Sequence, residues 1–231
     1  MEDKIILIDK PAGISSFGVV AKVRGRLKAE FGHKVKVGHT GTLDPFATGL
    51  LILLSGKMTK KSNEFLKKDK EYIATMKLGF VSTTGDPEGE IQPYLAQTKS
   101  AYSECFGLDE VKSVIQSFIG KIEQTPPKFS AIKINGERAY KLARKNEDFE
   151  IPSRKVTIYE IEILEYNYPE LKIRCHVSSG TYIRTLAEDI GKALGTGAYL
   201  TALRRTKIAD YDVMDAKKME DYLLLDGLKD D

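Results

Sequence analysis

The stretch GHTGTLDP, Gly38–Pro45, places a single carboxylate, Asp44, in a segment whose composition is typical of a tight loop. Three glycines bracket that carboxylate: Gly38, Gly41 and Gly49. Glycine allows a ligand to come close to the backbone. An aspartate followed by proline is most often a turn or helix-capping residue. Taken alone, the stretch therefore leaves Asp44 either a turn residue or a functional carboxylate in a glycine-rich loop.

The segments on either side of this loop carry a mixture of strand and helix patterns. Residues 5–8 read as a buried strand, and a helix is expected next, capped by Ser15 or Ser16 and ended by Gly32. Further strands are expected at residues 34–37, 72–78, 129–134, 156–166, 171–177 and 203–213, and residues 50–54 form an apolar run. Further helices are expected at residues 108–119, at 183–194 after a cap at 178–181, and at 218–225. Because strands and helices do not alternate strictly, the pattern predicts an α+β fold around a mixed sheet.

The positive charge is concentrated in two clusters, although the net charge of the 231 residues is only +3. The first basic cluster consists of Lys57, Lys60, Lys61, Lys67, Lys68 and Lys70. The second basic cluster consists of Lys128, Lys133, Arg138, Lys141, Arg144 and Lys145. Each cluster by itself fits a solvated helix face as well as it fits phosphate binding. Two such clusters in a nearly neutral chain favour a polyanionic partner.

Several classes of function lack their sequence signatures. The cysteines, Cys105 and Cys175, have no CxxC spacing, and the three histidines show no metal-binding spacing, so no metal is expected. Neither a phosphate loop nor a dinucleotide-binding glycine pattern is present, so no nucleotide cofactor is expected. The charged first residues and the shortness of every apolar run predict a cytoplasmic protein without a membrane span.

Several blocks of the sequence, in the same order along the chain, resemble the TruB family of tRNA pseudouridine synthases. They are IDKPAGISS at 8–16, GHTGTLDPFATGLL at 38–51, KEY at 70–72, GTYIRTL at 180–186 and LRRT at 203–206. The resemblance implies the pseudouridine synthase catalytic fold, with a central mixed and largely antiparallel sheet flanked by helices. It also implies one catalytic domain over residues 1–231, with an RNA-gripping insertion at about 121–150. The C-terminal PUA domain of typical bacterial members is expected to be absent.

The resemblance further implies that the chain isomerises the T-loop uridine at position 55 of tRNA to pseudouridine. The base is detached at its N1–C1′ bond, turned, and rejoined through C5, without any cofactor. Asp44 matches the catalytic aspartate of the family. Whether its carboxylate attacks the sugar, attacks the base or first removes the C2′ proton stays open at the level of sequence.

Arg184 is expected in the first turn of its helix, where a cation opposes the helix dipole. Its long side chain either reaches solvent or compensates the negative charge of a buried anion. In the resemblance, Arg184 matches the residue that pairs with the catalytic aspartate, here Asp44. Such a pair is needed because burial raises the pKa of an aspartate and a nearby cation lowers it again.

Five further residues are implied to bind the substrate. Tyr72 matches the tyrosine that stacks on the flipped base, and His39 resembles the residue that enters the space vacated by that base. Tyr182 and Leu203 correspond to residues lining the uracil pocket. Lys10 matches a lysine whose role is either contact with RNA or structural support of the Asp44 segment.

The partner implied by the resemblance is the T-arm and T-loop of tRNA, bound by a monomer. Two other readings compete with it. One is a non-catalytic RNA-binding or RNA-folding protein that uses the same basic surface. The other is a synthase of the same fold that acts on a different RNA.

Overall fold

A computed structural model describes residues 2–94, 107–130, 132–134, 136–145 and 147–224. The chain forms two compact units. Unit 1 comprises Met1–Tyr72 and Leu203–Asp231, and unit 2 comprises Ile73–Ala202. The boundary between the units falls within strands β4 (Lys70–Leu78) and β12 (Ala198–Ile208), so each of these strands contributes residues to both.

Unit 1 is built on a mixed sheet. Besides its share of β4 and β12 it contains β1 (Ile5–Lys10), α1 (Ser16–Phe31), β2 (Val37–His39), β3 (Thr48–Ser55), η1 (Gly56–Lys61), α2 (Ser62–Leu66), β13 (Tyr211–Asp212), η3 (Val213–Asp215), β14 (Lys217–Lys218) and α6 (Met219–Leu223). The strand order is β14-β1-β3-β12, with β2 paired to β3 and β13 to β12. The β1–β3 and β2–β3 pairs are antiparallel, whereas β1–β14 and β3–β12 are parallel.

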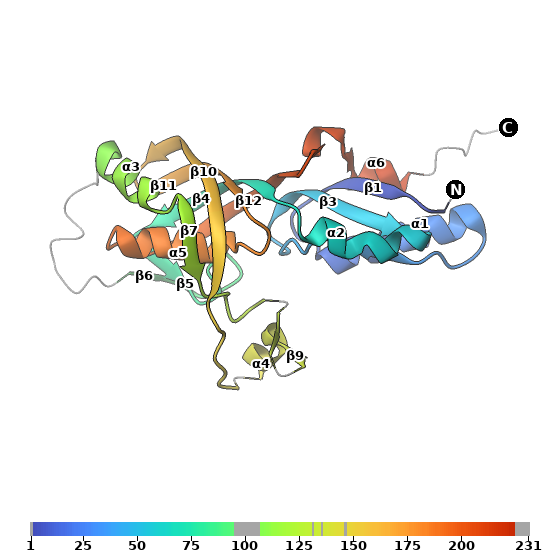
Figure 1. Ribbon diagram of the computed structural model, residues 1–231, viewed down its shortest axis with the longest axis horizontal. Coiled ribbons are helices and arrows are strands. Elements are labelled where there is room, and N and C mark those ends of the chain that lie inside the picture. The colour runs from blue at the N-terminus through green and yellow to red at the C-terminus, as the bar shows by residue number, and fades with distance from the viewer. Residues whose placement is uncertain (1, 95–106, 131, 135, 146, 225–231) are drawn as a thin grey trace. The chain divides into compact units, whose positions relative to one another are not determined.

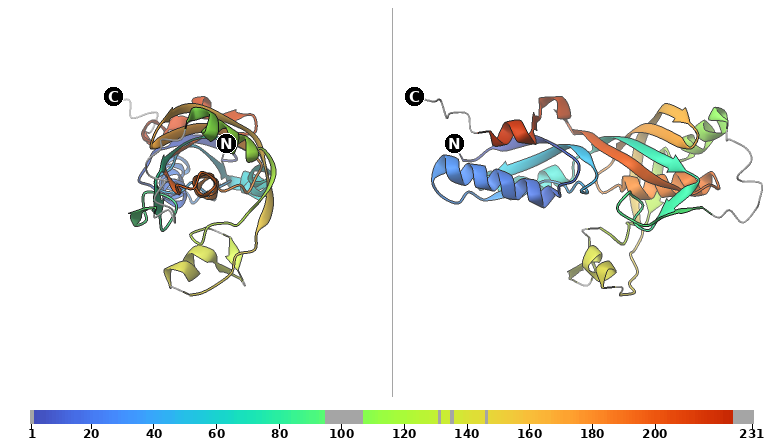
Figure 2. Two further views of the ribbon diagram at one scale, coloured as in Figure 1. Left: turned by 90° about the vertical axis from the view of Figure 1, so that its left-hand side faces the viewer. Right: turned by 180° about the vertical axis from the view of Figure 1, so that it is seen from behind.

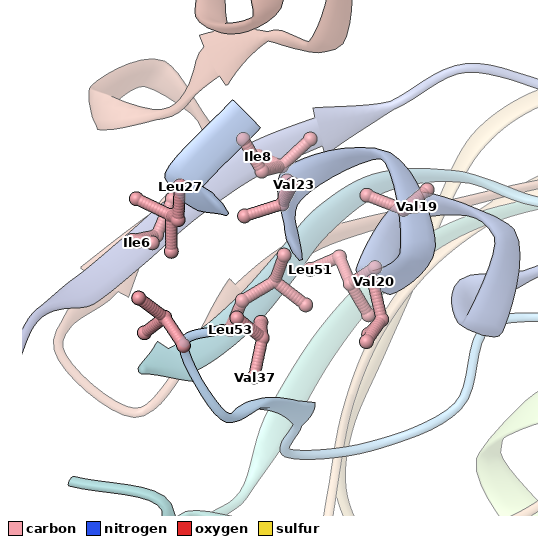
Figure 3. Packing of buried hydrophobic residues seen from close by; sticks show 10 residues of the cluster. Ile6, Ile8, Val19, Val20, Val23, Leu27, Val37, Leu51 and Leu53 are labelled. Carbon is pink, nitrogen blue, oxygen red and sulfur yellow. The ribbon is translucent and has the colours of Figure 1, made fainter. Parts of the chain in front are cut away.

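Helix α1 begins and ends where the sequence predicts. The side chain of Ser15 accepts a hydrogen bond from the Gly18 N–H at 3.0 Å, which satisfies one free donor of the first turn. Gly32 closes the helix with a φ of 74°, a left-handed conformation that glycine adopts at little cost. One face of α1 packs on β1, β2 and β3 (Figure 3). The buried side chains shown there are Ile6, Ile8, Val19, Val20, Val23, Leu27, Val37, Leu51 and Leu53.

Unit 2 contains a second part of the sheet, in the order β4-β11-β10-β7. Its elements are β5 (Phe80–Ser82), β6 (Ile91–Pro93), α3 (Leu108–Ser117), β7 (Gly120–Gln124), β8 (Lys133–Ile134), β9 (Glu137–Arg138), α4 (Ala139–Arg144), β10 (Arg154–Asn167), β11 (Glu170–Val177) and α5 (Ile183–Ala193). The β10–β11 and β10–β7 pairs are antiparallel. Figure 2 shows α5 nearly end-on in its left panel, with the curved sheet of this unit passing over it.

The expected insertion at about 121–150 leaves the sheet later than its predicted start. Residues 121–124 belong to β7, which pairs with β10 in the sheet. The chain departs after Gln124 and returns at Arg154. Between these points it carries α4 and the β8–β9 hairpin, which extend away from β7 and β10 (Figure 1).

The predicted α+β fold with a mixed, largely antiparallel sheet is confirmed, with local corrections. The strand predicted at 129–134 is limited to β8. The helix predicted at 183–194 spans Ile183–Ala193, but its N-cap residue is Tyr182 rather than one of residues 178–181. The Ser178 hydroxyl instead accepts a hydrogen bond from the Thr157 N–H at 2.8 Å. The strand predicted at 203–213 begins earlier and ends at Ile208, because Ala209 takes a left-handed φ of 48° that breaks the extended backbone.

Candidate active site

Asp44 lies in the loop of residues 40–47 between β2 and β3, called the Asp44 loop below. Hydrogen bonds fix the loop on both sides of the carboxylate. The Thr40 N–H donates to the Ile52 carbonyl at 3.0 Å, and the Ala47 N–H donates to the carbonyl of Asp44 itself at 3.1 Å. The buried Ser16 hydroxyl donates to the Leu43 carbonyl and accepts from the Leu43 N–H, both at 2.8 Å. The residue before Asp44 is therefore anchored to the first turn of α1.

Lys10 supports the same loop from β1. Its side chain is fully buried, and its ammonium group donates to the carbonyl oxygens of Pro11 at 2.9 Å, Ile14 at 2.8 Å and Pro45 at 3.2 Å. An ammonium group has three donors, so these carbonyls engage all of them. The Pro45 carbonyl also accepts from the Gly13 N–H at 2.8 Å. Lys10 thus ties the turn after β1 to the residue that follows Asp44.

Arg205 is a buried residue of the site that sequence reasoning missed. Its Nε donates to the Leu50 carbonyl at 2.8 Å, while its Nη2 and Nη1 donate to the carbonyls of Gly41 at 3.2 Å and Thr42 at 3.5 Å. β12 runs so close to β3 that a Cβ on Gly49 would lie 2.2 Å from the Arg205 carbonyl oxygen. Arg205 belongs to the LRRT block at 203–206, but of that block only Leu203 was predicted to be a site residue.

Three other predicted site residues lie in unit 1 with Asp44. His39 is the last residue of β2, directly before the Asp44 loop, and is half-buried. Tyr72 is buried in β4. Leu203 is buried in β12, and its carbonyl accepts a hydrogen bond from the Thr48 hydroxyl at 3.5 Å. Unit 1 therefore carries the carboxylate, the candidate stacking residue and one candidate pocket residue.

Arg184 is buried in unit 2, so its side chain does not simply reach solvent. Only 4% of the residue is exposed, although it stands in the first turn of α5. Its Nη1 donates to the Thr84 carbonyl at 2.9 Å, and its Nη2 donates to the Phe129 carbonyl at 2.8 Å. Nη1 also lies 3.3 Å from Oδ2 of the buried Asp86. The pairing of Arg184 with Asp44 stays a prediction.

Asp86, which the sequence did not single out, holds Arg184 within unit 2. It lies in the loop between β5 and β6. Its Oδ1 accepts hydrogen bonds from the Thr84 hydroxyl at 2.6 Å and from the Glu88 N–H at 3.0 Å. Its Oδ2 is left to face the guanidinium of Arg184. The hydrogen bonds within this loop thus hold one carboxylate oxygen of Asp86 and the Thr84 carbonyl in place beside the Arg184 guanidinium.

Glu188 lies one helical turn after Arg184 in α5, and its pKa is raised. A Cβ on Gly85 would lie 2.5 Å from Glu188 Oε1, so the carboxyl group packs against the backbone of the Asp86 loop. Burial is the main cause that raises the pKa of Glu188 to about 7, with smaller contributions from the charges of Asp189 and Asp86. The positive charge of Arg184 opposes this shift. The charge of the Arg184 guanidinium therefore acts on both the buried Asp86 and the half-buried Glu188.

Tyr182 is the N-cap residue of α5 and is fixed by a buried glutamine of β7. The Tyr182 N–H donates to the side-chain oxygen of Gln124 at 2.7 Å, and the Gln124 amide donates back to the Tyr182 carbonyl at 3.0 Å. The guanidinium of Arg154 lies over the tyrosine ring, 4.7 Å from its centroid. The backbone and the ring of this candidate pocket residue are thus both held in place.

The basic clusters differ in how much of their charge is exposed. In the first basic cluster Lys70 is buried, which removes it from any RNA-binding surface. The other members of that cluster are exposed and make no ion pair with an acid of the described residues. Every member of the second basic cluster is exposed on the insertion, where Lys145 pairs with Glu137 at 3.2 Å. Both clusters present cations at the surface of their own unit.

Two further observations concern the described part of the chain. No group of three or more histidine, cysteine, aspartate or glutamate residues there has the geometry to hold a metal ion. None of the helices within residues 2–94 and 107–224, apart from the few positions left undescribed, is long and apolar enough to cross a membrane.

Comparison with known proteins identifies relatives across almost the whole chain. The family model described as TruB family pseudouridylate synthase (N-terminal domain) matches residues 27–183, and that described as tRNA pseudouridylate synthase B C-terminal domain matches residues 184–227. A relative named tRNA pseudouridine synthase B from Phocaeicola vulgatus is 47% identical over 96% of this chain and 92% of its own length. One of the same name from Aquifex aeolicus is 45% identical over 96% of this chain and 74% of its own.

Solved structures give the same result for the fold. The crystal structure of a Cbf5-Nop10-Gar1 complex matches 96% of this chain with a TM-score of 0.71 and 30% identity. The structure of an H/ACA RNP bound to a substrate RNA containing 2′-deoxyuridine matches with a TM-score of 0.68 and 28% identity. This chain spans 54% and 52% of those two chains, about half their length.

Proposed function

Since the chain belongs to the TruB family of pseudouridylate synthases, we propose that it converts uridine 55, in the T-loop of tRNA, to pseudouridine. The enzyme class and the pseudouridine synthase fold expected from the sequence are confirmed by the family and by the solved neighbours. The observation that carries the proposal is the construction of the Asp44 loop. Its backbone is fixed before and after the one carboxylate, as a reacting group requires.

The reaction is an isomerisation, so every atom of the product comes from the uridine. The task of the protein is to position and stabilise the reacting atoms. Asp44 provides the anionic group beside the ribose and the base, acting on the sugar, on the base or on the C2′ proton. Each of these roles requires an ionised carboxylate. A half-buried position raises the pKa of an aspartate, so nearby cations are needed to oppose that shift.

Arg184 is the cation that we assign to Asp44 during the reaction. Its guanidinium is buried and is held by two backbone carbonyls and by the carboxylate of Asp86. A planar guanidinium held this way keeps its orientation and loses little further entropy when it binds another carboxylate. We therefore assign to Asp86 the role of setting the direction of Arg184.

The remaining residues serve the flipped base. Extrusion of a stacked uridine costs a few kcal/mol, and stacking on an aromatic face returns about 1–3 kcal/mol. Tyr72 supplies that face, and His39 enters the space that the base leaves. Tyr182 and Leu203 line the uracil pocket.

The partner in this proposal is the T-arm of tRNA, bound by a monomer. The exposed second basic cluster lies on the insertion that leaves the sheet after Gln124, which suits a segment that grips RNA. Lysine and arginine side chains there neutralise phosphates, so binding should weaken as the salt concentration rises. The non-catalytic reading has less support, because a protein that only binds RNA does not need a carboxylate in a fixed loop.

The test is incubation of the protein with unmodified tRNA, followed by mapping of pseudouridine along the RNA. Wild type should modify position 55, and Asp44→Asn should bind the same tRNA without forming product. The matched control is Asp109→Asn, a surface change at a carboxylate that is 97% exposed. Modification at a different position would reassign the target, and the absence of any product with wild type would favour the RNA-binding reading.

A further inference from the structure

Two buried cations, Arg205 and Lys70, lie beside the Asp44 loop and have no part in the reaction as described so far. Arg205 is 1% exposed and Lys70 is 8% exposed. They belong to the LRRT and KEY blocks, in which only Leu203 and Tyr72 carry an expected role. Buried charges are costly for a fold unless an anion or a set of hydrogen bonds compensates them.

The side chains of both cations pass beside Gly41 of the Asp44 loop. A Cβ on Gly41 would lie 3.7 Å from Nη1 of Arg205 and 4.0 Å from Cε of Lys70. The Arg205 guanidinium reaches the carbonyls of Gly41, Thr42 and Leu50, so it spans the loop from its beginning to β3. The Lys70 ammonium donates to the carbonyl of Leu66 at 3.0 Å and to that of Lys68.

Placing these two like charges together opposes folding. The pKa of Lys70 is lowered to about 8, mainly by burial and then by the positive charge of Arg205. The negative charge of Asp69 opposes this shift. Carbonyl oxygens satisfy the N–H donors but carry no net charge. Among the charged groups of unit 1 near the Asp44 loop are the cations Lys10, Lys70 and Arg205, with Asp69 beside Lys70. The titratable His39 precedes the loop, and the Arg204–Asp9 pair lies beside the start of β3 that follows it.

This excess of cations over acids near the Asp44 loop has a physical explanation, which rests on the proposed function. We propose that Arg205 and Lys70 are positioning residues for Asp44: the Arg205 fork fixes the peptides before the carboxylate, and both positive charges stabilise its negative form. The two cations thus lower the stability of the fold but help to keep Asp44 ionised for the reaction, against the effect of its own partial burial.

The experiment is a pH profile of the single-turnover rate of pseudouridine formation, with enzyme in excess over unmodified tRNA. Lys70→Met keeps the length of the side chain and removes its charge. We expect the acid limb of the profile to move to higher pH, so that the rate below its midpoint falls by about threefold or more, equal to roughly half a pKa unit. Above about pH 8 wild-type Lys70 is itself largely neutral, so the two profiles should converge there.

Arg205→Lys tests the hydrogen-bonding geometry of this side chain separately from its charge. It keeps the positive charge but loses the fork that reaches three carbonyls. We expect a lower rate at every pH, with the acid limb in its wild-type position. The matched controls are Arg204→Lys, the neighbour on β12 whose fork instead holds Asp9 at 2.7 and 3.0 Å, and Lys217→Met, an exposed lysine of β14. Both controls should keep the wild-type profile.

The outcomes separate this proposal from the proposed function. If wild type forms pseudouridine and Lys70→Met follows its pH profile throughout, the electrostatic role is wrong. If Arg205→Lys keeps the wild-type rate, or loses no more rate than Arg204→Lys, the positioning role is wrong. Thermal unfolding of each variant accompanies the kinetics, because Lys70→Met should leave the fold equally or more stable while it slows the reaction at low pH. A wild-type protein without product would instead overturn the function of Asp44 itself.

Discussion

Arg184 Nη1 and Asp86 Oδ2 lie 3.3 Å apart in unit 2, with 5% and 3% of their side chains exposed. This buried ion pair gives the cation of the candidate site a fixed direction before any substrate arrives. The Thr84 and Phe129 carbonyls complete the arrangement by engaging both terminal nitrogens of the guanidinium. The orientation of Arg184 is thus encoded in a loop that is remote in sequence from its own helix.

Asp86→Asn should destabilise the protein and slow the reaction together. The change leaves the Arg184 guanidinium buried without its carboxylate, and loss of one partner of a buried pair costs roughly 3–5 kcal/mol. Urea unfolding measures the stability, and single-turnover assays measure the rate. Asp109→Asn, at the exposed Asp109–Lys112 pair, should change the free energy of unfolding by less than about 1 kcal/mol. Equal stabilities of Asp86→Asn and wild type would show that the pair does not support the fold.

Arg184→Lys should reduce the rate of pseudouridine formation by at least about 100-fold, a loss in the range seen when one preorganised charge-stabilising donor is removed. Lysine keeps the charge but lacks the planar fork that engages Thr84, Phe129 and Asp86 at once. Filter binding should show little change in tRNA affinity. Arg174→Lys, at an exposed pair with Glu162, provides the control. A normal rate in Arg184→Lys would remove Arg184 from the proposed mechanism.

Glu188 predicts a pH dependence of stability. Burial raises the pKa of Glu188 in the folded state to about 7, above the ordinary value of 4.5 for a glutamate. The folded protein therefore binds this proton more tightly, and its stability contribution is fully present below pH 4.5 and is lost as the pH rises through about 7. Urea unfolding between pH 5 and 8 should show a smaller loss of stability with rising pH in Glu188→Gln than in wild type. Parallel curves for the two proteins would contradict the shifted pKa.

Gly49→Ala should be among the most disruptive single changes in unit 1. Its φ is 102°, and the added Cβ would lie 2.2 Å from the Arg205 carbonyl oxygen, where β3 and β12 pair. A clash with backbone adds to the conformational cost, so a loss of more than about 4 kcal/mol is expected. Gly13→Ala, at a φ of 81° with open space around it, should cost only about 1–2 kcal/mol. Thermal unfolding measures the stability of both variants. Similar losses of stability would show that the backbone shifts to relieve the contact between the added Cβ of residue 49 and the Arg205 carbonyl.

The sequence predicted the elements whose signals are local. The capped helix α1 and the apolar runs of β1 and β3 appear where their patterns indicate, since caps and periodicity act within a few residues. The early end of β12 could not be foreseen, because it follows from the left-handed φ of Ala209 rather than from hydrophobicity. β7, an edge strand of the sheet, was missed because Ile122 is the one large apolar residue in its sequence GKIEQ.

The parts of the site that the sequence missed depend on contacts over long separations. Asp86 stands in a loop without a recognisable motif, and only the fold shows that it is buried against Arg184. Arg205 lies in the LRRT block and Lys70 in both the KEY block and the first basic cluster, but no pattern in the sequence indicates that either is buried. Their burial follows from the packing of β4 and β12, which no local pattern reports.

The hydrogen bond from Arg205 to the Gly41 carbonyl joins residues that are 164 positions apart. A ribosome adds about 5–20 residues per second, so roughly 8–33 s pass between synthesis of the two. During that interval the nascent chain already contains Asp44, but its loop lacks the guanidinium that spans it. The order of translation thus delays completion of this half of the site until β12 has been made, when most of the chain is in place.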